Sequence, residues 1–135
     1  MRLPRVRELP IVFRCGALTA LVPLLVKFLP LSRVFSILKQ GDRPGDRSFD
    51  AGELAEIARV AVRFGPLFGA GECLVRSLVL YRLLRRSAYE PVLLIGGRLC
   101  DGQLDCHCWI EVDGKSLCEF NDPRETFKLL YECYE

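Results

Sequence analysis

A cysteine and a histidine in this chain have the spacing and local context of a catalytic pair. Cys73 follows a glycine-rich stretch, residues 65–71, and opens a segment with helical periodicity. Its sulfur is therefore expected at the positive end of a helix dipole, where unpaired backbone N–H groups favour a thiolate. His107, the only histidine, lies in a later strand-like segment. A neutral imidazole is the usual base or ion-pair partner of such a thiol, so the pair predicts covalent acyl transfer.

The group that orients the imidazole depends on the turn of a predicted hairpin. The pair Asp113-Gly114 is a strong hairpin signal between two apolar runs. A three-residue loop would place Glu119 directly across from His107, with Cβ atoms about 5 Å apart. A two-residue loop would place Phe120 there and turn Glu119 to the opposite face. Asp122, beyond the strand end, is the reserve candidate for this third role.

Each of these residues could also have a purely structural role. Free cysteine is among the most buried residue types, so Cys73 alone could be a packing residue. Trp109 shares the predicted face of His107 and would be either a lid or ordinary packing. The alternating Cys106 and Cys108 point away from His107. They suggest a thiolate metal site completed by Cys100 and Cys118, but the paired C-x-x-C spacing is absent, and we expect neither a metal nor a cofactor.

Composition bounds the class of protein. With 135 residues and 50% hydrophobic content, the chain can bury the core of one domain. The formal charge of +2 is too small to predict a nucleic-acid partner. Seven irregularly spaced cysteines do not resemble a secreted disulfide framework, so we expect a cytoplasmic protein.

The N-terminal region is apolar and helical in character. Residues 9–39 predict one or two buried or partner-facing helices, divided near Pro23 or Pro30. Its longest uncharged segment, residues 15–26, is too short to span a bilayer of about 30 Å. No cleavage site typical of a signal peptide follows it. This region could pair two copies of the chain or associate weakly with a membrane surface.

The pattern predicts three parts: an apolar helical region over 1–40, a linker over 41–50, and a catalytic domain over 51–135. In the last, Asp50 and Glu53 have capping-box spacing at the start of a helix over about 51–64.

A second helix begins at Cys73, with an apolar stripe on one face and Arg76 elsewhere on the surface. Short apolar runs follow at 89–99, 104–112 and 115–120. Helices followed by an antiparallel sheet predict an α+β domain.

Two stretches resemble a known family. CLVRSLVLYRLLRRSAYEPVLLIGG begins at Cys73, and CHCWIEVDGKSLCE contains His107. They resemble the transglutaminase-like cysteine proteases of lasso peptide biosynthesis, the B-protein leader peptidases, whose pattern runs approximately C-L-x-R-S-L, a strand, then H-A-W-V-E-V-D-G and an acidic residue. The match covers residues 73–122 closely. It implies a transglutaminase-like or papain-like core with Cys73 as nucleophile, His107 as base and Glu119 as acidic member.

The sequence departs from the family pattern at two positions, and the resemblance implies a specific activity with specific partners. Cys108 stands where the family usually has alanine. The family's acidic member is often Asp preceded by Asn, whereas here Cys118 precedes Glu119 and Asn121-Asp122 comes later, so the third role stays open between Glu119 and Asp122. The implied activity is removal of the leader from a ribosomally made precursor peptide. The freed amine would be closed into a macrolactam by a separate ATP-using, asparagine-synthetase-like partner. The chain is too short for a fused winged-helix recognition domain, so a separate leader-recognition protein is implied.

Two other functions remain open on the sequence. The same constellation fits a transamidating or amidase enzyme of the wider transglutaminase-like group. The long apolar N-terminal region also fits a non-catalytic scaffold of a peptide-maturation complex.

Overall fold

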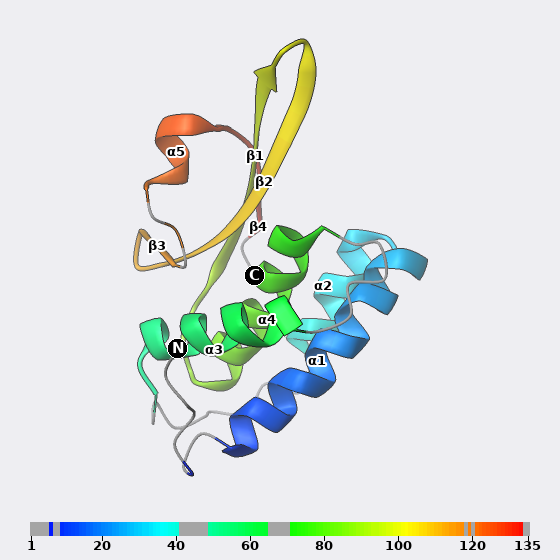
Figure 1. Cartoon of the computed structure of the whole chain (residues 1–135), viewed down its shortest axis with the longest axis vertical. Coiled ribbons are helices and arrows are strands. Elements are labelled where there is room, and N and C mark those ends of the chain that lie inside the picture. Colours follow the sequence, from blue (N-terminus) through cyan, green and yellow to red (C-terminus); the bar gives the residue numbers. More distant parts are fainter. Residues whose placement is uncertain are drawn as a thin grey trace.

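A computed structural model of the chain describes residue 6 and residues 9–40, 49–64, 71–117, 119 and 121–133 (Figure 1). Helices come first and a four-stranded antiparallel sheet follows, which confirms the α+β prediction. Most of the predicted linker, residues 41–48, lies outside the described residues. In chain order the elements are α1 (Leu9–Phe28), α2 (Leu31–Lys39), α3 (Ala51–Phe64), α4 (Glu72–Arg86), β1 (Val92–Cys100), β2 (Gln103–Val112), β3 (Lys115–Leu117), α5 (Pro123–Thr126) and β4 (Lys128–Cys133).

The two N-terminal helices divide at Pro30 and not at Pro23. Helix α1 continues through Pro23, whereas Pro30 has an extended backbone and caps the start of α2. By length and composition alone, α1 could cross a membrane. It is longer than the uncharged segment 15–26, because it also contains Arg14 and Lys27 on either side of that segment. One side of α1 nevertheless packs on α3 and α4 within the core.

The predicted capping box starts α3. The side chain of Glu53 accepts a hydrogen bond from the backbone N–H of Asp50 at 3.3 Å, and the side chain of Asp50 accepts one from the N–H of Gly52 at 2.6 Å. These bonds satisfy N–H groups that have no partner inside the helix. They fix the start of α3 at the residue that the sequence predicted.

Helix α4 is the central element of the core. Leu78 and Leu84 are fully buried and Tyr81 is 1% exposed, as the helical stripe predicted. The helix contacts α1, α2 and α3 on one side and strands β1 and β2 on the other. The position of its first turn is therefore fixed against the sheet by a large apolar interface.

The sheet has the order β3-β2-β1-β4, and the β1–β2 hairpin projects beyond the helices (Figure 1). Val112 pairs with Lys115 across a two-residue turn in which Asp113 and Gly114 have φ of 52° and 76°. Two consecutive positive φ values are typical of a type I′ turn. The three-residue loop considered from the sequence is therefore wrong. Helix α5 and strand β4 were not predicted, and β4 forms the edge of the sheet beside β1.

Candidate active site

Cys73 lies in the first turn of α4. The first helical hydrogen bond runs from the N–H of Val75 to the carbonyl oxygen of Gly71 at 3.1 Å, so the N–H of Cys73 has no acceptor within the helix. Gly71 occupies the N-cap position and has no side chain that could accept from this turn. The Cys73 side chain is partly exposed. The sulfur thus lies at the positive end of a helix dipole, beside N–H groups that have no acceptor within the helix.

Beyond the end of β3, the uncovered edge of β2 contacts α4 at Cys108. Strand β3 is so short that its ladder with β2 ends at the pair Ile110–Leu117. Because backbone groups alternate in direction along an antiparallel strand, the N–H and C=O of Cys108 also point away from β1, past the end of β3. The hydroxyl of Ser77 on α4 donates to the Cys108 carbonyl oxygen at 3.2 Å. This contact holds the start of α4 against the strand that carries His107.

The surroundings of Cys73 favour its thiolate. Hydrogen bonding from the Cys108 thiol lowers the pKa of Cys73 most, and the Cys108 backbone N–H, the charge of His107 and a hydrogen bond with its ring lower it further. Burial acts in the opposite direction, and the resulting pKa is about 5. The same contact raises the pKa of Cys108. Of the two neighbouring thiols, Cys73 is the one ionised at neutral pH, because it has the imidazole and the helix terminus beside it.

The acidic partner of the imidazole is Glu119. Its Oε1 lies 3.0 Å from Nε2 of His107, and the two side chains are only 14% and 22% exposed. The two-residue turn was expected to turn Glu119 away from His107. That expectation was wrong because β3 ends at Leu117, so Glu119 is no longer bound by the alternation of the strand. With Nε2 facing the carboxylate, Nδ1 remains as the nitrogen for Cys73.

Arg76, which lies three residues after Cys73 in α4, forms an ion pair with Glu119. Its Nη2 lies 3.3 Å from Oε1 of Glu119, and its side chain is 18% exposed. Arg76 was expected on the surface, away from the apolar stripe, and its pairing with Glu119 was not predicted. Arg76 follows Cys73 by three residues, so both side chains emerge on one side of the helix. That spacing is the signal that could have identified it.

Aromatic rings surround the imidazole on its face of the sheet. The ring centroids of Phe127 and Trp109 lie 5.2 and 6.1 Å from that of His107, and both rings are nearly parallel to it. Trp109 is 1% exposed, so it packs beneath the site and is not a mobile lid. A Cβ atom on Gly96, the β1 partner of His107, would lie 2.7 Å from Cβ of Phe127. Glycine at this position lets Phe127 approach the site.

The remaining acidic residues near the site stabilise structure. The buried carboxylate of Glu111 accepts two hydrogen bonds from Arg124, at 2.9 and 3.1 Å, and one from the indole N–H of Trp109 at 3.1 Å. The Arg124 contact is the main cause of the lowered pKa of Glu111. Asp122, the reserve candidate for the triad, caps α5 by accepting from the N–H of Arg124 at 3.0 Å. The structure therefore brings Glu119, and not Asp122, to the imidazole.

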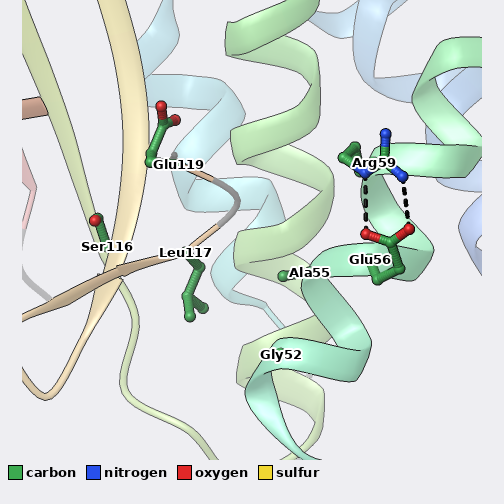
Figure 2. Close-up of a pocket in the computed structure, with 7 residues that line it drawn as sticks. All are labelled: Gly52, Ala55, Glu56, Arg59, Ser116, Leu117 and Glu119. Carbon is green, nitrogen blue, oxygen red and sulfur yellow. Dashed lines mark hydrogen bonds and ion pairs between the residues drawn. The ribbon is translucent and has the colours of Figure 1, made fainter. Parts of the chain in front are cut away.

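A cavity of about 460 Å³ opens beside Glu119, between α3 and β3. Figure 2 shows Glu119, Ser116 and Leu117 on one side and α3 on the other, where Arg59 and Glu56 form an ion pair. Gly52 and Ala55 complete the lining. The cavity thus combines small and apolar groups with one charged pair, next to the carboxylate of the candidate triad.

The remaining cysteines do not form a metal site in the described part of the chain. Cys100 and Cys106 are exposed, whereas Cys108 is buried against α4. No group of three or more His, Cys, Asp or Glu side chains among the described residues has an arrangement that could hold a metal ion. Cys118 lies outside the described residues.

Comparison with known proteins identifies the family. A family model described as the transglutaminase-like superfamily matches residues 18–132, a range that includes the three candidate site residues. Comparisons with curated proteins and with solved structures gave no match. The helices followed by a four-stranded antiparallel sheet agree with a transglutaminase-like fold. The chain therefore belongs to the transglutaminase-like superfamily, whose members are typically cysteine-dependent proteases or transamidases.

Proposed function

We propose that this protein is a cysteine peptidase that removes the leader from a lasso peptide precursor. The observation that carries the enzymatic part is the 3.0 Å contact between Glu119 and His107 beside the Cys73 thiol, whose pKa is lowered to about 5. Membership of the transglutaminase-like superfamily supports cysteine-dependent acyl transfer. The sequence resemblance over residues 73–122 supports the leader peptide as substrate.

The first half of the reaction forms a thioester. The Cys73 thiolate attacks the scissile carbonyl carbon, and the oxyanion that develops accepts a hydrogen bond from the Cys73 backbone N–H. The C–N bond then breaks, and the protonated His107 gives its proton to the departing amine of the core peptide. Glu119 holds the ring in position and stabilises its positive charge.

The second half regenerates the enzyme. Neutral His107 accepts a proton from water as the water oxygen attacks the thioester carbon. The carbon–sulfur bond breaks, Cys73 leaves as a thiolate, and the leader departs with a new carboxylate. The adjacent rings of Phe127 and Trp109 keep bulk water from one side of the imidazole.

The same proposal assigns the partners and the compartment. A separate recognition protein presents the leader of the precursor, and the freed core amine passes to an ATP-using, asparagine-synthetase-like macrolactam synthetase. Both assignments rest on the sequence resemblance, whereas the cytoplasmic location rests on the irregular spacing of the seven cysteines. The cavity between α3 and β3 is the place where residues of the precursor would bind, since Glu119 of the candidate triad is one of its lining residues.

The cognate precursor and recognition protein provide the test. In water enriched in ¹⁸O, the wild type should release the leader with one ¹⁸O atom in its new carboxylate. Cys73→Ala should lower the cleavage rate by roughly 10³-fold or more. Cys100→Ala is the matched control, because Cys100 is exposed on the distant end of the β1–β2 hairpin and should leave the rate unchanged. Equal rates for Cys73→Ala and the wild type would refute the proposal.

Membership of the superfamily also supports a transamidase as the second candidate function. The two functions differ in the group that attacks the thioester, which is water in one and an amine in the other. An added primary amine distinguishes them in the same mass spectra. A leader whose carboxyl end carries the amine in place of water would establish the transamidase and overturn the peptidase.

A further inference from the structure

One side of α1 presents an exposed apolar surface along the helix. Phe13 is 78% exposed, Phe28 is 75% exposed and Leu21 is 50% exposed. At 100° per residue, the exposed positions of α1 form one continuous face, and they are Leu9, Pro10, Phe13, Arg14, Gly16, Ala17, Ala20, Leu21, Leu24, Lys27 and Phe28. Nine of these eleven residues are apolar, so this face is largely apolar although it is exposed. We call these eleven residues the α1 face.

The α1 face lies flat on the outside of the domain. The opposite side of the helix is held in the core by the fully buried Cys15 and Val22. Phe13 and Phe28 are 15 residues apart, so the two exposed rings are separated by about 22 Å along the helix axis. A helix held in this way cannot cross a bilayer while the domain stays folded, but it can lie in the plane of a membrane surface.

The charges at the margin of the α1 face are positive. Arg14 and Lys27 are exposed near its two ends, and Arg33 is exposed on the adjoining α2. In the sequence, residues 1–40 contain seven Lys or Arg residues and one Glu, whereas residues 41–135 contain twelve Lys or Arg and sixteen Asp or Glu. The positive charge of the protein is thus concentrated in the same region as its exposed apolar surface. Anionic headgroups complement this arrangement.

A second copy of the chain complements the α1 face less well. The face is centred near Ala20 and Leu21, so a two-fold antiparallel pairing would bring Arg14 of one copy to the level of Lys27 of the other, on the opposite margin, and no Asp or Glu of the α1 face could pair with either. Cations gathered at an interface without acidic partners make it less favourable. A lipid surface places anions beside both cations at once.

From this combination we propose that the α1 face docks the protein on an anionic membrane surface. Phe13 and Phe28 insert into the boundary between headgroups and acyl chains, and Arg14 and Lys27 reach to the lipid phosphates. The inference is independent of the proposed peptidase activity, because none of these residues belongs to the candidate site.

Vesicle flotation with the full-length purified chain tests the proposal. The protein should float with vesicles of phosphatidylglycerol and phosphatidylcholine, and its affinity should fall at least tenfold on vesicles of phosphatidylcholine alone. Phe13→Ser with Phe28→Ser should lower the affinity for the mixed vesicles by tenfold or more. Arg14→Glu with Lys27→Glu should remove the preference for the anionic lipid and its sensitivity to salt.

The matched control is Leu99→Ser with Leu130→Ser, which removes two apolar side chains that are 80% and 57% exposed on the sheet. This variant should float like the wild type. No flotation of the wild type, or equal loss of binding in the control, would overturn the proposal. So would a dimer in sedimentation that Phe13→Ser with Phe28→Ser converts to a monomer without any change in flotation. Circular dichroism of each variant establishes that the fold is retained.

Discussion

Glu119 contacts His107 although the two residues are not partners in the sheet. The distance from Oε1 to Nε2 is 3.0 Å, and the contact forms because β3 ends two residues before Glu119. The short strand has a second effect, since it leaves the edge of β2 open to Cys73 and Ser77 of α4. One local feature, the early end of β3, thus brings the acid, the imidazole and the thiol to the same place.

Replacement of the acid tests its role against that of the reserve candidate. Glu119→Gln keeps the shape of the side chain but loses the charge that stabilises the imidazolium, so kcat/KM for precursor cleavage should fall by about 10²-fold or more. Asp122→Asn should retain activity, because Asp122 caps α5 and asparagine is an equally good N-cap residue. The reverse ranking of the two variants would assign the third role to Asp122.

Arg76 is expected to act by positioning Glu119. Arg76→Met removes the 3.3 Å ion pair and frees the carboxylate to move, so kcat should fall by about ten- to a hundredfold with a smaller change in KM. Arg76→Lys should recover part of the loss, since it restores the charge without the planar guanidinium. Arg63→Met, at an exposed position of α3, is the control. A change in KM alone would show that Arg76 binds substrate and does not position the acid.

The pH dependence of alkylation tests the contact between the two thiols. The rate at which iodoacetamide modifies Cys73 follows its thiolate fraction, so the rate should rise with pH through a midpoint near 5 and level off above it. Cys108→Ala removes the strongest stabilising hydrogen bond, and the midpoint should move upward by about one pH unit or more. Mass spectrometry of digested peptides separates Cys73 from the exposed Cys100 and Cys106. An unchanged midpoint in Cys108→Ala would show that the Cys108 thiol does not stabilise the Cys73 thiolate.

The ion pair between Glu111 and Arg124 should stabilise the fold in a pH-dependent manner. Arg124→Met leaves a buried carboxylate with fewer partners, so the free energy of unfolding should fall by about 1–3 kcal/mol at neutral pH. Because the pKa of Glu111 is lowered in the folded state, its contribution is present above the ordinary value of 4.5 and is lost as pH falls below it. The difference between variant and wild type in urea unfolding should therefore shrink in acid.

The control for this measurement is the exposed pair of Arg59 and Glu56, whose side chains are 43% and 60% exposed. Arg59→Met should change the free energy of unfolding by less than about 1 kcal/mol. Equal losses in the two variants would mean that burial of Glu111 does not strengthen its ion pair.

Gly96 should be intolerant of any side chain. In Gly96→Ala the new methyl group would meet Cβ of Phe127 at 2.7 Å and the Trp109 ring at 2.9 Å, so the free energy of unfolding should fall by about 1–3 kcal/mol. Gly16→Ala is the matched control, since a Cβ atom there has nothing within 4 Å and alanine is the better helix former. Thermal unfolding should give opposite signs for the two variants. A stable Gly96→Ala would show that Phe127 can move away from His107.

Much of the fold could be predicted because local signals and the final structure agree. The capping box placed the start of α3 at the correct residue, and the apolar stripe of α4 became the centre of the core. The pair Asp113-Gly114 identified a hairpin but not its loop length, because both lengths use a glycine with positive φ. Strand β4 was missed because its residues lack both a strong alternation and a turn signal linking them to β1, their partner far earlier in the chain.

In the site, only the nucleophile and the imidazole could be predicted from residue type and local element. Cys73 and His107 were recognised by their elements, and both lie where those elements place them. The contact with Glu119 could not be derived by counting along strands, because it forms outside the ladder. Cys108 was missed as a contributor because its role depends on how α4 meets the edge of β2, a tertiary contact that no local pattern encodes. Arg76 was missed although its three-residue spacing from Cys73 is a local signal, because its partner Glu119 lies far along the chain.

The most direct test is the acyl-enzyme itself. Precursor cleavage under single-turnover conditions, quenched in acid and examined by intact mass, should show a transient species heavier by the acyl leader, with the adduct on the peptide that contains Cys73. Cleavage by the wild type with no adduct at any time, or with the adduct on another cysteine, would contradict the account.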